Sequence, residues 1–164
     1  MHAAETVKGF AAIRSAEYRG VARAETYVLW AQDMLEAGLE SAALLRLAVA
    51  DVPYFTPDLK RLFDLAVEEA GIEPLSGTPA LILHGQQVAA DFLAGFIRPG
   101  EAGAMLAEIF TPELAPPGFG HWQQLDEASW CDYCRESFTG PDRTLDQAIV
   151  EEATKLLAIR WREQ

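Results

Sequence analysis

The residues whose types and spacing could do chemistry are gathered at Trp130–Cys134, which read Trp-Cys-Asp-Tyr-Cys. This sequence matches the motif of a redox dithiol, in which the N-terminus of a helix lowers the pKa of the first thiol. Such a dithiol follows a buried strand in a βαβ setting. Residues 121–129 are too polar for a buried strand, and Asp126, Glu127 and Asp132 disfavour a thiolate nearby. The sequence therefore argues against dithiol redox catalysis.

Cys131 and Cys134 could instead supply half of a zinc site. A structural zinc needs four ligands, either two such cysteine pairs or one pair with two histidines. Only His121 lies close in sequence, since His2 and His84 are far away. A metal would need a distant ligand or a second subunit, so we predict no metal site.

The interpretation that we favour for Cys131 and Cys134 involves no chemistry. The two residues are three apart, which places them on one face of a helix, and a free cysteine behaves as a small buried apolar residue. We expect packing residues. The sequence alone leaves open whether the pair packs or binds a metal together with His121.

Other motifs of catalysis are missing from the sequence. It contains no Glu-x-x-His, nucleophile elbow, phosphate-binding loop or His-Glu-x-x-His. The acidic pairs Glu68–Glu69 and Glu151–Glu152 are expected to be solvated, because neighbours on a helix do not face each other. We predict no catalytic or cofactor-binding residue, no cofactor, and a protein without catalysis of its own.

Composition excludes further classes of function. The chain has 164 residues, 13 Lys and Arg against 25 Asp and Glu, and a net charge of −12, which argues against nucleic-acid binding. Its apolar stretches, such as Ala80–Leu83, are too short to span a membrane, and the segment Met1–Glu5 does not resemble a signal peptide. We expect a cytoplasmic protein with two reduced cysteines.

The periodicity of apolar residues and the richness in Ala and Leu predict an all-α protein. The first expected segment is a short helix or an arm, and the segment 122–138 has irregular flanks, so the count is about six to seven helices. Helical segments are expected at 3–18, 22–39, 41–48, 56–71, 78–97, 101–110, within 122–138, and at 144–161.

Several residues predict where these helices begin and end. Gly38 and Gly71–Ile72 fit left-handed endings, and Ser41 fits an N-cap. Thr56–Pro57 and Thr78–Pro79 each combine a hydroxyl N-cap with proline at the first helical position. Thr144 opens the last helix, which should end near Trp161, whereas Asp51–Pro53 should stop the third.

The segment 78–97 has a rival interpretation, in which residues 80–84 form a short strand that turns at Gly85. We prefer a helix, because no second strand-like run exists to pair with it. We expect Pro99–Gly100 to break the chain. The expected buried face comprises Leu81, Gly85, Val88, Ala89, Phe92 and Phe96.

We expect residues 1–164 to form a single compact helical domain. Residues 111–120 contain three prolines and two glycines and form a loop, and if the chain divides, it should divide there. Trp30 and Trp161 are expected in the core. Trp122 and Trp130 could be core or surface, and an exposed aromatic cluster there would indicate a protein interface.

Acidic residues are concentrated in the last third of the chain. Between residues 126 and 152 there are eight acids against Arg135 and Arg143. Such a surface could steer a basic partner, although solubility is the commoner reason for it.

Two stretches carry a resemblance. Residues 30–48 fit the pattern W-A-x-x-L-L-x-x-G-x-x-S-x-x-L-x-x-L-A in most positions, and residues 91–103 fit helix–G-x-I-x-P-x-E-G–helix in part. Together they resemble small helical bacterial proteins of unknown function, some of which look like immunity or accessory proteins beside toxin genes. The likeness covers residues 27–157 in patches and does not include Cys131 or Cys134. It implies a non-enzymatic cytoplasmic protein.

We therefore expect a binding protein that docks a protein partner or a second copy of itself, with an immunity-type neutraliser as one version, and neither nucleic acid nor membrane as partner. The first alternative is a metal-binding or thiol redox protein built on Cys131 and Cys134. The second is a small-molecule binder with an apolar pocket between helices near Trp30, Phe63 and Phe92.

Overall fold

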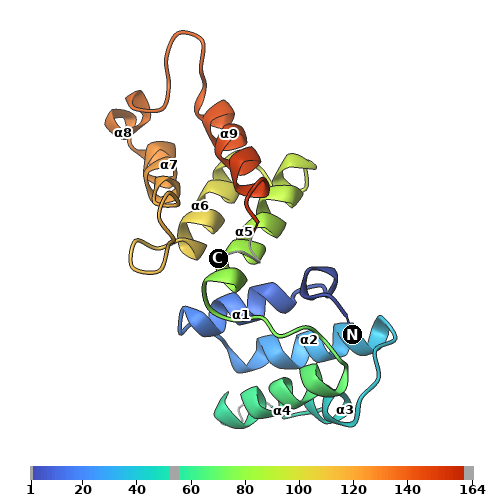
Figure 1. Cartoon of the computed structure of the whole chain (residues 1–164). Helices are drawn as coiled ribbons and strands as arrows, with labels where there is room; N and C mark the ends of the chain where they lie inside the picture. The colour runs from blue at the N-terminus through green and yellow to red at the C-terminus, as the bar shows by residue number, and fades with distance from the viewer. Residues whose placement is uncertain (1, 52–55, 161–164) are drawn as a thin grey trace. The chain divides into compact units, whose positions relative to one another are not determined.

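The computed structural model describes residues 2–51 and 56–160 (Figure 1). These residues form nine α-helices and one 3-10 helix, and they contain no strand beyond two isolated bridges, His2 with Ile72 and Gly140 with Arg143. The prediction of an all-α protein is confirmed, with more helices than the expected six to seven. One added helix arises at Cys131, whose extended backbone (φ −116°, ψ 110°) divides the segment 122–138 in two.

Internal contacts divide the chain into two compact units, 1–76 and 77–164. The loop at 111–120, where we expected any division, lies inside the second unit. That residues 1–164 behave as one domain stays a prediction. None of the described helices is long and apolar enough to cross a membrane.

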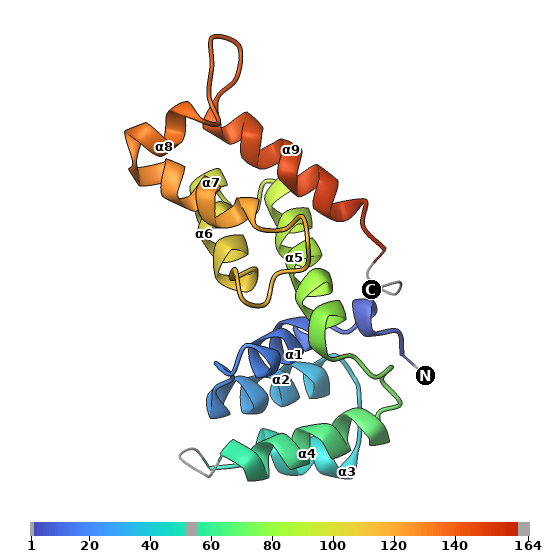
Figure 2. The ribbon, with the colours of Figure 1, turned by 60° about the vertical axis from the view of Figure 1, so that its left-hand side comes forward.

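The first unit is a small helical bundle with an aromatic core. Helix α2 packs on α3 and α4, and α3 packs on α4 (Figures 1 and 2). Phe10, Tyr27, Trp30 and Phe63 are buried together, which confirms the predicted core position of Trp30. The elements are η1 (Ala4–Thr6), α1 (Phe10–Tyr18), α2 (Ala24–Glu36), α3 (Ala42–Ala48) and α4 (Thr56–Glu69).

The predicted ends of these helices are largely confirmed. The Ser41 hydroxyl accepts a hydrogen bond from the Leu44 amide at 2.9 Å and so caps α3. Gly71 is left-handed (φ 64°), and the buried Ile72 folds back on α4. Helix α3 ends at Ala48, and the predicted stop at Pro53 lies outside the described residues.

Helices α5 and α9 pack side by side in the second unit, as do α6 and α7. The segment between α8 and α9 projects as a loop in both views (Figures 1 and 2). The core is built from all the longer helices and includes Phe92, Phe110 and Trp122. The elements are α5 (Gly77–Leu93), α6 (Pro99–Ile109), α7 (His121–Trp130), α8 (Asp132–Glu136) and α9 (Leu145–Leu157).

Residues 80–84 lie inside α5, so the prediction of helix over strand is confirmed. Helix α5 begins at Gly77, one residue before the predicted Thr78 cap. The predicted burial of Phe96 is wrong. The helix ends at Leu93 and the chain reverses through left-handed Gly95 (φ 84°), which leaves Phe96 82% exposed.

Pro99 begins α6 rather than breaking the chain. A proline fits the first position of a helix, because the amide that it lacks would have no partner there. Thr144 forms the capping box of α9 with Gln147, as expected for the start of the last helix. That helix ends at Leu157, and Trp161 lies outside the described residues.

Candidate functional site

The turn between α7 and α8 is fixed by hydrogen bonds on both sides of Cys131. The Cys131 amide donates to the Glu127 carbonyl at 2.9 Å, and the Cys131 carbonyl accepts from the Arg135 amide at 2.9 Å. The Arg135 side chain also donates to the carbonyls of Ala128 and Ser129, each at 3.0 Å. Arg135 therefore ties α8 back to the last turn of α7.

Cys131 and Cys134 are free cysteines, and each is partly exposed. They are therefore less buried than we expected, and whether they serve only in packing stays a prediction. Helix α8 has five residues and none of them is buried, because so short a helix projects no continuous face onto the core. The pair lies at the surface of the second unit.

The two thiols have opposite tendencies. The backbone amide of Cys134 and then its thiol lower the pKa of Cys131, with a contribution from the Tyr133 amide, against burial and the Asp132 charge. The hydrogen bond to Cys131, followed by burial and the charges of Cys131 and Glu127, raises the pKa of Cys134. If either thiol ionises, Cys131 does so first.

A metal at this pair has no third ligand in the part of the chain that the structure describes, where no three His, Cys, Asp or Glu side chains gather. His121 is the first residue of α7 and Cys131 follows the last, so about 15 Å of helix separates them at 1.5 Å per residue. His121 therefore lies too far along the helix to complete a zinc site with Cys131 and Cys134.

Two large aromatic side chains flank the cysteines and lie in solvent. Trp130 is 72% exposed and Tyr133 is 83% exposed, whereas Trp122, at the other end of α7, is buried. The sequence left Trp122 and Trp130 undecided. Trp122 belongs to the core of the second unit, whereas Trp130 is the last residue of α7 and lies outside that core.

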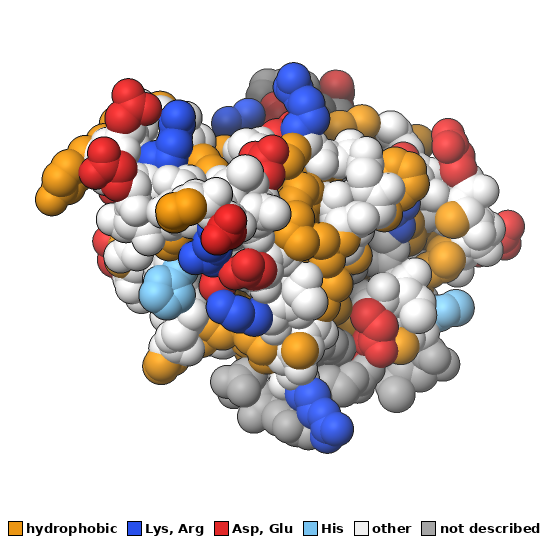
Figure 3. Space-filling model, turned by 90° about the horizontal axis from the view of Figure 1, so that it is seen from above, with side chains coloured by type: hydrophobic (Ala, Val, Ile, Leu, Met, Phe, Trp, Pro, Cys, Tyr) orange, Lys and Arg blue, Asp and Glu red, His pale blue; other side chains and the backbone are white. Residues whose placement is uncertain are grey.

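Three of the four residues in the acidic pairs are exposed, as predicted, whereas the Glu152 side chain is only 20% exposed. Glu68 and Glu69 are exposed, but Glu69 also accepts a hydrogen bond from the Ala43 amide at 2.9 Å and so helps to cap α3. Glu151 pairs with Arg143 and Glu152 pairs with Lys155, each at 2.6 Å. Figure 3 shows a face on which acidic, basic and apolar side chains are interspersed.

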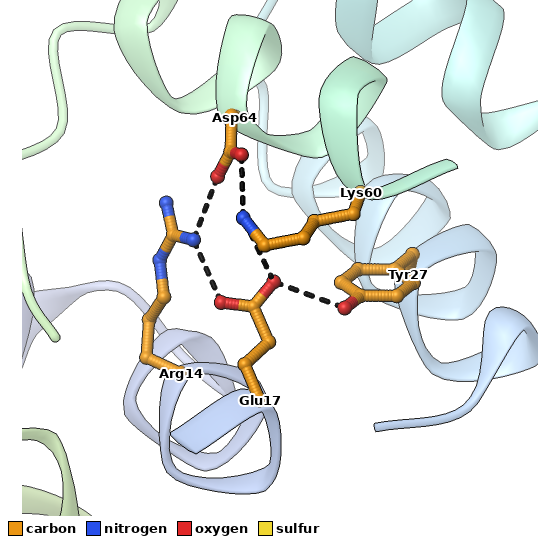
Figure 4. Close-up of polar contacts among 5 residues, drawn as sticks. All are labelled: Arg14, Glu17, Tyr27, Lys60 and Asp64. Atoms are coloured by element: carbon orange, nitrogen blue, oxygen red, sulfur yellow. Dashed lines mark hydrogen bonds and ion pairs between the residues drawn. The ribbon is translucent and has the colours of Figure 1, made fainter. Parts of the chain in front are cut away.

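The first unit contains a polar network that the sequence analysis did not predict (Figure 4). Nη1 of Arg14 donates to Glu17 at 2.8 Å and to Asp64 at 2.7 Å. Nζ of Lys60 lies 2.6 Å from Asp64 and 3.8 Å from Glu17, and the Tyr27 hydroxyl donates to Glu17 at 2.9 Å. Three helices contribute to it, and helical periodicity does not reveal such tertiary pairing.

This network has the geometry of a structural element. The charged groups of Arg14, Lys60, Glu17 and Asp64 are paired with one another, and such pairing neutralises groups that chemistry would need free. Burial, then the charge and hydrogen bond of Glu17, raises the pKa of Tyr27, so the phenol stays neutral and donating.

An open groove of about 590 Å³ runs between α3 and α4. That Trp30, Phe63 and Phe92 lie near an apolar pocket stays a prediction. The rings of Trp30 and Phe63 pack directly, with centroids 4.8 Å apart, and Phe92 belongs to the core of the second unit. The groove is lined instead by Arg46, Asp58, Arg61, Leu62, Asp64, Leu65 and Glu68.

Comparison with known protein families, curated proteins and solved structures finds no match for this chain.

Proposed function

We propose that this chain is a non-catalytic binding protein that docks a basic protein partner through the end of α7 and α8. We call this surface the α8 corner and define it by Trp130, Asp132, Tyr133 and Glu136. The observation that carries the proposal is that Trp130 and Tyr133 are 72% and 83% exposed on a segment where α8 buries none of its residues.

Aromatic exposure and charge both support docking. Trp and Tyr are enriched among the residues that dominate binding energies, because they bury a large area at a small cost in conformational entropy. Asp132 and Glu136 are exposed beside them, in a chain of net charge −12. Opposite charge on the partner would speed association and favour a basic surface.

The finer version of this proposal is an immunity-type protein that neutralises a basic toxin in the cytoplasm. It is supported by the acidic charge and by the resemblance of residues 30–48 and 91–103 to small helical bacterial proteins. The proposal assigns no reaction to the chain. A second copy of the chain is the competing occupant of the α8 corner.

A photo-crosslinking residue placed at position 133 in the living cell tests the proposal. The matched control is position 49, because Val49 in the first unit is 82% exposed and Tyr133 is 83% exposed. We expect one basic protein to crosslink from position 133 and not from position 49. The purified pair should then bind, and Trp130→Ala should weaken Kd about thirty-fold, as for a residue worth about 2 kcal/mol.

Val49→Ala should leave that Kd within about two-fold, because isolated exposed apolar residues contribute little. High salt should weaken binding through screening of the acidic charge. Equal crosslinking from both positions contradicts the proposal. A purified pair whose Kd is unchanged by Trp130→Ala contradicts it as well. If the only crosslinked product is two copies of this chain, the α8 corner is a homodimer interface and not the docking site of a different partner.

A further inference from the structure

The groove between α3 and α4 contains two arginines that form no ion pair with any residue that the structure describes. Arg46 comes from α3 and Arg61 from α4, and both are exposed. Asp64 also lines the groove, but it is already paired with Arg14 and Lys60. The two free guanidinium groups therefore offer hydrogen-bond donors and positive charge to a carboxylate in the groove.

Two leucines of α4 add apolar surface beside these arginines. Leu62 is partly exposed and Leu65 is 41% exposed, and both line the groove. They follow Arg61 by one and four residues, and residues four apart are neighbours on a helix surface. The volume of about 590 Å³ lies within the range of ligand pockets, which is about 300–1,000 Å³. The groove can therefore hold a ligand with both an apolar and a negatively charged part.

An acid without a partner among the described residues lies farther along the groove. Glu68 is exposed and belongs to the last turn of α4, whereas no basic residue lies in that turn. The helix dipole disfavours a carboxylate there, because the last carbonyls carry partial negative charge. A cation at Glu68 would thus be stabilised by the carboxylate and by the helix end. Asp58 also lines the groove, but it lies in the first turn of α4, where the dipole already favours it.

The spacing of these groups indicates the length of a matching ligand. Arg61 and Glu68 are seven residues apart on α4, which corresponds to about 10.5 Å at 1.5 Å per residue. Three residues of extended peptide span at most about 10–11 Å. A tripeptide can therefore place its carboxylate at Arg61 and its ammonium group at Glu68, with its side chains over the two leucines.

We propose that the groove between α3 and α4 binds a short peptide with free ends and apolar side chains. Arg46 and Arg61 bind its carboxylate, and Glu68 binds its ammonium group. Such a ligand has no net charge, so the net charge of −12 on the chain does not repel it. The groove lies in the first unit and the α8 corner in the second, so this site does not rest on the proposed protein partner.

Titration of the isotope-labelled full-length protein with trileucine, followed by NMR, tests the proposal. We expect saturable shifts of amide signals in α3 and α4. Three related peptides each lack one feature: trileucine amide lacks the carboxylate, N-acetyl-trileucine lacks the ammonium group, and triglycine lacks the apolar side chains. Each should bind at least about three-fold more weakly than trileucine, because it loses an exposed ion pair or the apolar contacts.

Two variants with matched controls assign the two ends of the peptide. Arg61→Gln should weaken trileucine binding about three- to five-fold and leave the binding of trileucine amide unchanged. Its control is Arg23→Gln, which removes an exposed arginine of the same unit outside the groove. Glu68→Gln should weaken the binding of trileucine but not that of N-acetyl-trileucine. Its control is Glu36→Gln, at the exposed last residue of α2.

Several results would overturn the proposal. They are the absence of saturable shifts with trileucine, shifts confined to residues outside α3 and α4, and equal binding of trileucine and its amide or of trileucine and triglycine. Equal affinities of Arg61→Gln and Arg23→Gln for trileucine would overturn it as well. The dispersion of the amide signals confirms that each variant is folded.

Discussion

The guanidinium carbon of Arg14 lies 4.7 Å from the ring centroid of Phe63. Phe63 is fully buried, and the Arg14 side chain is only 12% exposed. The same guanidinium bonds the carboxylates of Glu17 and Asp64, so one cation serves both the aromatic core and the polar network above it. Removing the Arg14 guanidinium should therefore lower the free energy of unfolding by more than the loss of an exposed ion pair would.

Replacing Arg14 with methionine tests this relationship. The variant keeps an apolar stem over Phe63 but leaves Glu17 and Asp64 with Lys60 as their remaining cation. We expect the free energy of unfolding to fall by about 2–3 kcal/mol, because partly buried carboxylates lose their main counter-charge. Chemical denaturation at neutral pH measures the loss.

Lys60→Met is the matched control, because it removes a cation from the same network at a side chain that is 46% exposed. Its effect should stay below about 1 kcal/mol, as for exposed ion pairs. If the two variants lose equal stability, burial of Arg14 is not what gives the network its strength.

The lowered pKa of Asp64 predicts that the stability of the protein depends on pH in the acid range. Burial by itself would raise the pKa of Asp64, but hydrogen bonds from Lys60 and Arg14 and the charges of both lower it below its ordinary 3.8. A lowered pKa in the folded state gives stability that is present above pH 3.8 and is lost as pH falls through the folded value. Asp64→Asn should be less stable than wild type at pH 7, and this difference should shrink in acid.

The exposed carboxylate of Asp33 supplies the control, since Asp33→Asn makes the same change of charge on α2. Denaturation midpoints measured from neutral to acid pH should converge for Asp64→Asn and wild type. A difference that is constant over this range would show that Asp64 does not titrate with folding.

The raised pKa of Tyr27 predicts that the stability of the protein falls as the pH rises in the alkaline range. Burial, followed by the charge and hydrogen bond of Glu17, raises the pKa of Tyr27 above its ordinary 10.0. A raised pKa in the folded state gives stability that is present below pH 10.0 and is lost as pH rises above it. Tyr27→Phe should remove this alkaline loss and cost about 1 kcal/mol at neutral pH through the missing hydrogen bond. Denaturation between neutral pH and pH 11 checks both effects.

Much of the fold could be predicted from local features of the sequence. Ser41, Gly71 and Thr144 determine helix ends through hydrogen bonds to neighbouring residues, so their residue types suffice to predict them. The helical face of α5 was predicted up to Phe92, and the prediction failed at Phe96. Periodicity there continues past the point where left-handed Gly95 turns the chain.

The candidate sites were less predictable, because they depend on burial and on tertiary pairing. A Cys-x-x-Cys spacing is the same in a buried helix and in an exposed turn, and the five-residue length of α8 decides between them. The pairing of Arg14 with Asp64 joins residues 50 apart in the chain. No local pattern marks either partner.

Gly85 gives the last prediction, because α5 approaches the ring of Phe110 closely at this position. A Cβ added there would lie 2.5 Å from Cζ and 2.6 Å from Cε2 of Phe110, whose own ring packs on Phe119 at a centroid distance of 4.8 Å. Gly85→Ala should therefore lower the free energy of unfolding by about 1–3 kcal/mol, although alanine favours helix. Gly100→Ala in α6 is the matched control, since nothing lies within 4 Å of a Cβ there. We expect Gly100→Ala to stay within about 1 kcal/mol of wild type. If chemical denaturation finds Gly85→Ala as stable as Gly100→Ala, Phe110 moves aside with no loss of stability. The contact between α5 and Phe110 then does not determine how they pack.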